Sequence, residues 1–144
     1  MKKLLIILIL IFVGIQFVPM NVPADLPVKD GDAFDAPEEI QAILKQSCFD
    51  CHSSHTTFPW YSSVAPVSWF TKEHVKDARA KLNFSTWGSY TDEKKLKYLE
   101  KIPKAIESKM PMDSYLFMHK EATLSDAEKK AISDWATEAA FDLE

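Results

Sequence analysis

The chain opens with one continuous apolar run and then changes to amphipathic stretches. Residues from Leu4 to Val18 are apolar almost without interruption and follow Lys2 and Lys3, which is the order of a secretory n-region and h-region. The run is shorter than the ~20 residues that comfortably span a bilayer. Residues 1–18 therefore predict a signal peptide or a short membrane anchor. A buried core helix is the third interpretation, but such a helix rarely begins with Met-Lys-Lys.

Residues 19–34 are rich in proline and aspartate and predict a linker. The domain is then expected over residues 35–144. Its first helix should begin at Asp35, which forms a capping-box pattern with Glu38, and should run directly into Cys48. Its apolar face repeats at helical spacing and consists of Ile40, Ile43 and Leu44.

Three more helices follow from the same kind of pattern. The second is expected from Pro66 to about Leu82, because proline suits the first turn of a helix. The third is expected from Thr91 to about Ser108, with a kink or break at Pro103. The pattern of the second helix places His74 on its apolar face, where a lone histidine is usually a hydrogen-bonded core residue.

The fourth helix should begin at Ser125, which forms a second capping-box pattern with Glu128. Its buried stripe is expected to consist of Ile132, Trp135, Ala136 and Ala139. No segment shows sustained period-two alternation with β-branched residues, so the pattern predicts an all-α domain. The net charge of −4 and the absence of a basic patch give no reason to expect a nucleic-acid partner.

The only two cysteines occur in the run Cys48-Phe49-Asp50-Cys51-His52. Two thiols at this spacing reach the two vinyl groups of one porphyrin, and the following histidine can ligate its iron. The motif predicts one covalent haem c, anchored by Cys48 and Cys51, with His52 as the proximal ligand. The backbone carbonyl of Pro59 or of Pro66 is expected to fix the other ring nitrogen of His52.

Three other interpretations of this motif compete with haem. A redox-active disulfide normally accompanies a βαβ pattern, which is missing here. A zinc site would need two further ligands, and the sequence has neither a second cysteine pair nor a downstream histidine pair at the usual spacing. A chance occurrence is the third, with odds on the order of one in a thousand.

The sixth ligand of the iron is expected to be Met110, because a loop methionine before Pro111 can approach without a helix backbone in the way. A core methionine is the alternative role for this residue. The other candidate ligands are Met112, Met118, His74 and His119, whereas His55 lies too close to His52 in sequence to reach the other side of the ring. The aromatic candidates for the haem wall are Phe58, Trp60, Tyr61, Trp69 and Trp135.

Taken together, these segments resemble the bacterial haem-binding domain family of small exported proteins. The resemblance covers about residues 36–140 and is carried by the cysteine motif, Pro59-Trp60-Tyr61, Ala65-Pro66-Val67-Ser68-Trp69, His74-Val75, Leu82-Asn83-Phe84-Ser85, Trp87, Met110-Pro111, Tyr115 and Leu124-Ser125 to Trp135. The chain is also similar to class I cytochromes c, which implies a small cytochrome c-like helical fold. It departs from them in the long aromatic segment from Phe58 to Trp87.

The functional hypothesis from sequence is a one-electron carrier rather than an enzyme. His/Met ligation needs no substrate pocket, and redox partners would be met transiently. An export segment and a haem c predict a periplasmic or otherwise extracytoplasmic protein, held at the inner membrane if residues 1–18 stay uncleaved. The alternative is a sensor or peroxide-handling protein with an open sixth position, in which His74 or Tyr61 is a distal polar group. A structural haem module within a larger membrane complex is a third hypothesis.

Overall fold

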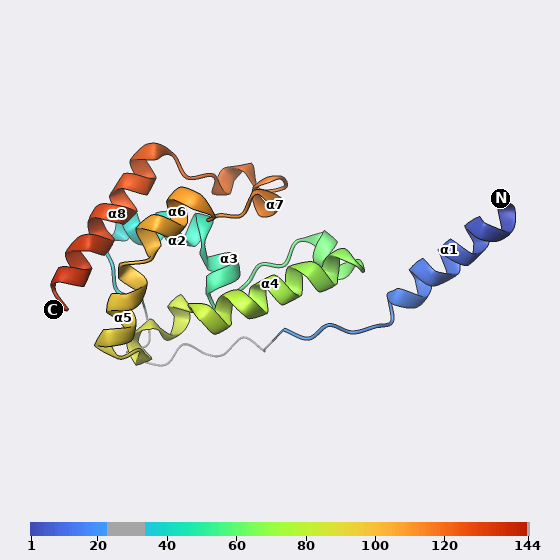
Figure 1. Ribbon diagram of the computed structural model, residues 1–144, viewed down its shortest axis with the longest axis horizontal. Helices are drawn as coiled ribbons and strands as arrows, with labels where there is room; N and C mark the ends of the chain where they lie inside the picture. Colours follow the sequence, from blue (N-terminus) through green and yellow to red (C-terminus); the bar gives the residue numbers. More distant parts are fainter. Residues whose placement is uncertain (23–33, 144) are drawn as a thin grey trace.

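The computed structural model describes residues 1–22 and 34–143, and within these ranges the regular elements are all helices (Figure 1). The predicted all-α class is therefore confirmed for the described part of the chain. The elements, in chain order, are α1 (Lys2–Ile15), α2 (Glu38–Ser47), α3 (Phe49–His52), η1 (Trp60–Ser63), α4 (Val67–Lys81), η2 (Phe84–Ser89), α5 (Asp92–Leu99), α6 (Ile102–Ser108), α7 (Asp113–Leu116), η3 (Lys120–Ala122) and α8 (Asp126–Phe141), where η marks a 3₁₀ turn.

The apolar N-terminal segment forms α1, which stands apart from the other helices (Figure 1). Its side chains from Leu4 to Val13 are all exposed. No helix within the described ranges has both the length and the hydropathy needed to cross a membrane. Most of the expected linker, residues 23–33, lies outside the described residues, as does residue 144.

Helix α2 begins three residues later than the sequence pattern predicted. Its N-cap is Pro37, with φ of −50° and ψ of 145°, and no side chain caps it. The predicted capping box of Asp35 and Glu38 is therefore wrong. The ring of Pro37 disfavours a helical conformation for Ala36, so the helix cannot start before the proline.

The proline at position 103 divides the third predicted helix into two. Helix α5 ends at Leu99 and α6 begins at Ile102, with Pro103 in its first turn. Pro103 has no N–H to donate to the Leu99 carbonyl, and its ring excludes a continuous helix here. The start at Thr91 is confirmed, since its side-chain oxygen accepts a hydrogen bond from the Lys94 amide at 3.3 Å.

The second predicted capping box is present at the start of α8. The Ser125 hydroxyl accepts the Glu128 amide at 3.3 Å, and the Glu128 carboxylate accepts the Ser125 amide at 2.8 Å. Of the predicted stripe, Ile132 and Ala136 are fully buried, while Trp135 and Ala139 pack against the core at its edge.

The hydrophobic core lies between α2, α5, α6 and α8. Phe34 is near its centre and makes edge-to-face contacts with Phe84, Trp87 and Trp135 at centroid distances of 4.8, 5.4 and 5.4 Å. Helix α2 is anchored there by Ile40 and Leu44, so its C-terminal end is held at the border of the core. This arrangement presents α3, which carries the cysteine motif, to the long helix α4.

Candidate functional site

The two cysteines and His52 lie on a single helical turn at the junction of α2 and α3. The Cys48 amide donates to the Leu44 carbonyl at 2.8 Å, and the His52 amide donates to the Cys48 carbonyl at 2.9 Å. Residues three and four positions apart on a helix are neighbours on one face. The local fold therefore directs two thiols and one imidazole to the same side of α3.

That side of α3 faces two adjoining cavities. The smaller, of about 250 Å³, is lined by Cys48, Cys51 and His52 on one wall and by Met110, Pro111 and Met112 on another. The larger, of about 390 Å³, is lined mainly by apolar groups of η1, α4 and α7. The residues that border both cavities are Cys51, His74, Met112 and Tyr115.

The imidazole of His52 has one nitrogen fixed and one available. Its Nδ1 lies 3.0 Å from the Leu82 carbonyl oxygen, which can only accept, so Nδ1 carries the proton and Nε2 keeps its lone pair. Burial lowers the pKa of His52, which favours the neutral ring that a metal needs. The prediction that the carbonyl of Pro59 or Pro66 bonds His52 is wrong. Leu82, at the end of α4, lies beside the ring instead.

Both cysteines are free thiols. Burial raises the pKa of Cys48 to about 12, and the neighbouring Cys51 adds to the shift. Burial and then the Asp50 carboxylate raise the pKa of Cys51 to about 11. Both sulfurs are therefore protonated at neutral pH. Within residues 1–22 and 34–143, no group of three or more His, Cys, Asp or Glu side chains is arranged to hold a metal ion.

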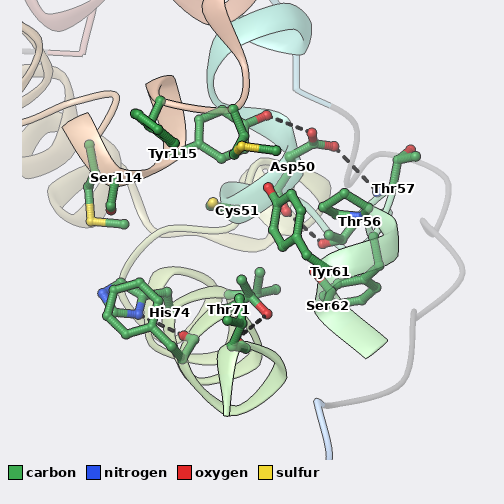
Figure 2. A pocket seen from close by; sticks show the side chains of 18 of the residues that line it. Asp50, Cys51, Thr56, Thr57, Tyr61, Ser62, Thr71, His74, Ser114 and Tyr115 are labelled. Carbon is green, nitrogen blue, oxygen red and sulfur yellow. Dashed lines mark hydrogen bonds between the residues drawn. The ribbon is translucent and has the colours of Figure 1, made fainter. Parts of the chain in front are cut away.

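Asp50, between the two cysteines, joins α3 to two other parts of the fold. Its carboxylate accepts a hydrogen bond from the Tyr115 hydroxyl at 2.8 Å and one from the Thr57 amide at 3.3 Å (Figure 2). Its backbone carbonyl accepts the Thr56 hydroxyl at 2.7 Å, which in turn accepts from Arg79 of α4 at 2.9 Å. These bonds fix α3 to the following loop, to α4 and to α7.

Four candidate distal ligands differ in their surroundings, the two methionines at positions 110 and 112 and the two histidines at positions 74 and 119. Met110, 37% exposed, and Met112 both line the smaller cavity, which the cysteine motif also lines. His74 borders both cavities, and its Nδ1 is bonded to the Phe70 carbonyl at 2.8 Å, which leaves Nε2 available. His119 has both ring nitrogens engaged, with the Tyr61 hydroxyl at 2.7 Å and the Glu121 carboxylate at 3.1 Å.

Two further residues from the sequence hypothesis take other positions. Met118 borders only the larger cavity, and the structure does not bring it to His52. His55 lines a separate cavity beside Phe49 and Phe84.

The aromatic candidates divide into two groups. Phe58, Trp60 and Tyr61 line the larger cavity, and Figure 2 shows Tyr61, His74 and Tyr115 around it with Cys51. Trp69 and Trp135 line neither cavity. The Trp69 indole N–H donates to the Val18 carbonyl at 3.1 Å, and Trp135 packs on Phe34 in the core.

Three residues of the site were not found from the sequence in these roles: Leu82, Asp50 and Tyr115. The Leu82 carbonyl and the Tyr115 hydroxyl come from segments that only the tertiary fold brings to α3. Asp50 lies inside the motif, but no local pattern indicates where its carboxylate points. The apolar face of α4 was the one available signal, and its members Val67, Phe70 and His74 do line the larger cavity.

Comparison with known proteins identifies the family. A family model described as a haem-binding domain matches residues 10–138. None of the curated proteins and none of the solved structures matches the chain. The matched residues include the whole cysteine motif, both adjoining cavities and the helices that frame them. This chain belongs to the haem-binding domain family and binds haem.

Proposed function

We propose that the domain of residues 35–144 carries one haem c, bound covalently through Cys48 and Cys51, and transfers single electrons outside the cytoplasm. The observation that carries this proposal is the placement of two thiols and one imidazole on one turn of helix, at the wall of a cavity. A disulfide enzyme or a chance motif would not require the imidazole nitrogen to be oriented toward that cavity by a carbonyl.

The protonated thiols suit the proposed attachment chemistry. Each S–H adds across one vinyl double bond, so that sulfur bonds to one carbon, hydrogen ends on the other, and no leaving group or oxidant is needed. Cys48 and Cys51 are separate, reduced thiols with raised pKa values. Attachment at both positions would fix the cofactor against α3, whose own position is held by the Asp50 hydrogen bonds.

His52 and Met110 are the proposed axial ligands. The Leu82 carbonyl holds the proton on Nδ1 of His52 and leaves Nε2 for the metal. Met110, just after the end of α6, lines the same small cavity. The lining of the larger cavity is mainly apolar, which suits a porphyrin, and a bound haem would supply reversible one-electron chemistry at its iron.

The exported location is proposed from the N-terminal segment and from the kind of cofactor. Lys2 and Lys3 followed by an apolar helix have the order of an export signal, and residues 19–34 would link that segment to the domain. A one-electron carrier of this size would meet its redox partner proteins through a small, transient surface.

An absorption spectrum of the purified holoprotein tests the ligand set. Methionine–iron ligation gives a weak band at the red end of the ferric spectrum, and we expect Met110→Ala to abolish it. Met112→Ala should retain the band, because it removes the neighbouring thioether and leaves Met110 in place. His119→Ala should also retain it, because both ring nitrogens of His119 are already hydrogen-bonded. Loss of the band in Met112→Ala alone would assign the ligand to that residue instead.

A second outcome of the same measurement would favour the sensor or peroxide-handling alternative. His74 and Tyr61 are two of the polar side chains at this mainly apolar cavity, where a distal group would be needed. A high-spin spectrum in the unmodified protein, together with rapid carbon monoxide binding, would contradict the electron-carrier proposal and support an open sixth position.

A further inference from the structure

The end of α1 is attached to the haem domain by specific hydrogen bonds. The Gln16 side-chain amide donates to the Ala65 carbonyl at 3.2 Å, and its oxygen accepts the Ala65 amide at 2.9 Å. Two residues later, the Val18 carbonyl accepts the Trp69 indole N–H at 3.1 Å. These three bonds join the apolar segment to the short stretch between η1 and the first turns of α4.

Exposed apolar side chains continue from α1 across this junction. Phe17 is 82% exposed and Val18 54%, and the η1–α4 end of the domain, to which this segment is hydrogen-bonded, exposes Trp60 at 74% and Val64 at 37%. We call these four residues the junction patch. Phe17, Val18 and Val64 line neither of the two cavities of the haem site, so a bound haem would not account for their exposure.

The apolar surface of α1 is exposed on every side. None of its residues is buried, and every side chain from Leu4 to Val13 is exposed. A helix that is apolar all round requires an apolar surrounding, which for a helix with no protein neighbour is lipid. The basic residues Lys2 and Lys3 at its start suit the charged headgroup region of a bilayer.

We propose that the junction patch is a lipid-docking surface, which holds the η1–α4 end of the haem domain in the membrane interface when α1, which is too short to cross the bilayer, inserts into the same leaflet. Tryptophan is enriched at this depth, because its ring is apolar and its N–H is polar. The Gln16 and Trp69 hydrogen bonds then act as positioning contacts, which set the orientation of the domain on the lipid. This inference rests on the proposal that residues 1–18 remain on the protein.

The orientation has a consequence for the haem site. Trp60 belongs both to the junction patch and to the wall of the larger cavity. That cavity would therefore lie next to the lipid surface, while α8 lies at the opposite end of the domain from α1 (Figure 1). A redox partner of the site would be met at the membrane and not from the α8 side.

Photo-crosslinking of the full-length holoprotein tests the proposal. The probe is a vesicle of phosphatidylethanolamine and phosphatidylglycerol that contains a phospholipid with a diazirine on its acyl chain. We expect lipid adducts, located by mass spectrometry, on the peptides of residues 58–67 as well as on α1. Adducts confined to residues 1–18, or a mature chain that lacks these residues, would overturn the proposal.

A variant pair separates positioning from insertion. In the double variant Gln16→Ala, Trp69→Phe, adducts on residues 58–67 should fall several-fold, while those on α1 should stay unchanged. Gln41→Ala, which removes a side-chain hydrogen bond to the Ala36 carbonyl elsewhere, is the matched control and should change neither. Unchanged adducts on residues 58–67 in the double variant would contradict the positioning role. The covalent haem is measured by mass in the same samples, so a failure of haem attachment is recognised separately.

Discussion

Asp50 occupies one of the two variable positions of the motif, and its carboxylate is committed to Tyr115 and to the Thr57 amide. Burial, the hydrogen bond and the charge of Asp50 all raise the pKa of Tyr115, so the phenol stays protonated and donates over the whole physiological pH range. The pair therefore connects α7, next to the proposed distal segment, to α3, which carries the proposed proximal ligand His52.

We expect Tyr115→Phe to lower the free energy of unfolding by about 1 kcal/mol, because Asp50 loses a hydrogen-bond donor at a half-buried site. Chemical denaturation of the holoprotein measures the change. Loss of stability without any change in ligation would agree with a structural role. A switch of axial ligand in Tyr115→Phe would contradict it.

The candidate haem-binding residues could be predicted from the sequence, because their spacing along the chain identifies them. Cys48, Cys51 and His52 are neighbours on one helical turn whatever the rest of the fold does. The partner of His52 could not be predicted, because the Leu82 carbonyl comes from a backbone group thirty positions away. A backbone carbonyl has no signature in the sequence.

At the scale of elements, side-chain capping and proline placement decide where helices begin. The capping box at Ser125 and the helix start at Thr91 were predicted correctly from local patterns. The α2 start was predicted three residues too early, because the capping-box pattern of Asp35 was given more weight than the constraint from Pro37. The sequence predicted either a kink or a break at Pro103, and the structure has a break, which separates α5 from α6.

Ser125→Ala should destabilise the domain by about 1 kcal/mol, because the cap of α8 loses the acceptor for the Glu128 amide. Urea denaturation at neutral pH measures this. Thr137→Ala, an exposed position on the same helix, should be close to neutral. An equal loss in both variants would show that the cap is not responsible.

The same cap has a predictable pH dependence. Hydrogen bonds from Ser125 hold the pKa of Glu128 below its usual value. A carboxyl group with a depressed pKa in the folded state contributes stability above its unfolded pKa, and that stability is lost as the pH falls through the folded pKa. The difference between the unmodified protein and Ser125→Ala should therefore become smaller in acid.

At the scale of the molecule, the core and the proposed haem site are separate but adjacent. The core is built by α2, α5, α6 and α8, whereas the cavities lie between α3, α4, η1 and the segment of α7. Helix α2 belongs to the first group and delivers the motif to the second. Stability of the core therefore controls whether the cysteines are presented to the cofactor.

Ile132→Ala removes a fully buried side chain of α8 and should cost about 2–5 kcal/mol of unfolding free energy. Phe141→Ala, on the exposed side of the same helix, should cost much less. Thermal and chemical unfolding of the holoprotein measure both. Similar losses in the two variants would contradict the assigned position of the core.

The overall arrangement was only partly predictable from the sequence. The helical periodicity predicted the all-α class. Trp135, which lines neither cavity of the proposed haem site, packs on Phe34, a core residue that lies before the first predicted helix. The position of Trp69 depends on its contact with Val18, in the segment that follows α1. Periodicity within one helix does not predict which neighbour covers a given aromatic ring.

The central claim is that the cofactor is attached through Cys48 and Cys51, and the most direct test is haem retention after denaturation. The full chain is produced with a c-type haem attachment system and then extracted with acidified organic solvent. We predict that haem stays with the unmodified polypeptide, seen as one added haem mass, and is extracted from the Cys48→Ala, Cys51→Ala double variant. Complete extraction of haem from the unmodified chain would contradict the proposed covalent attachment.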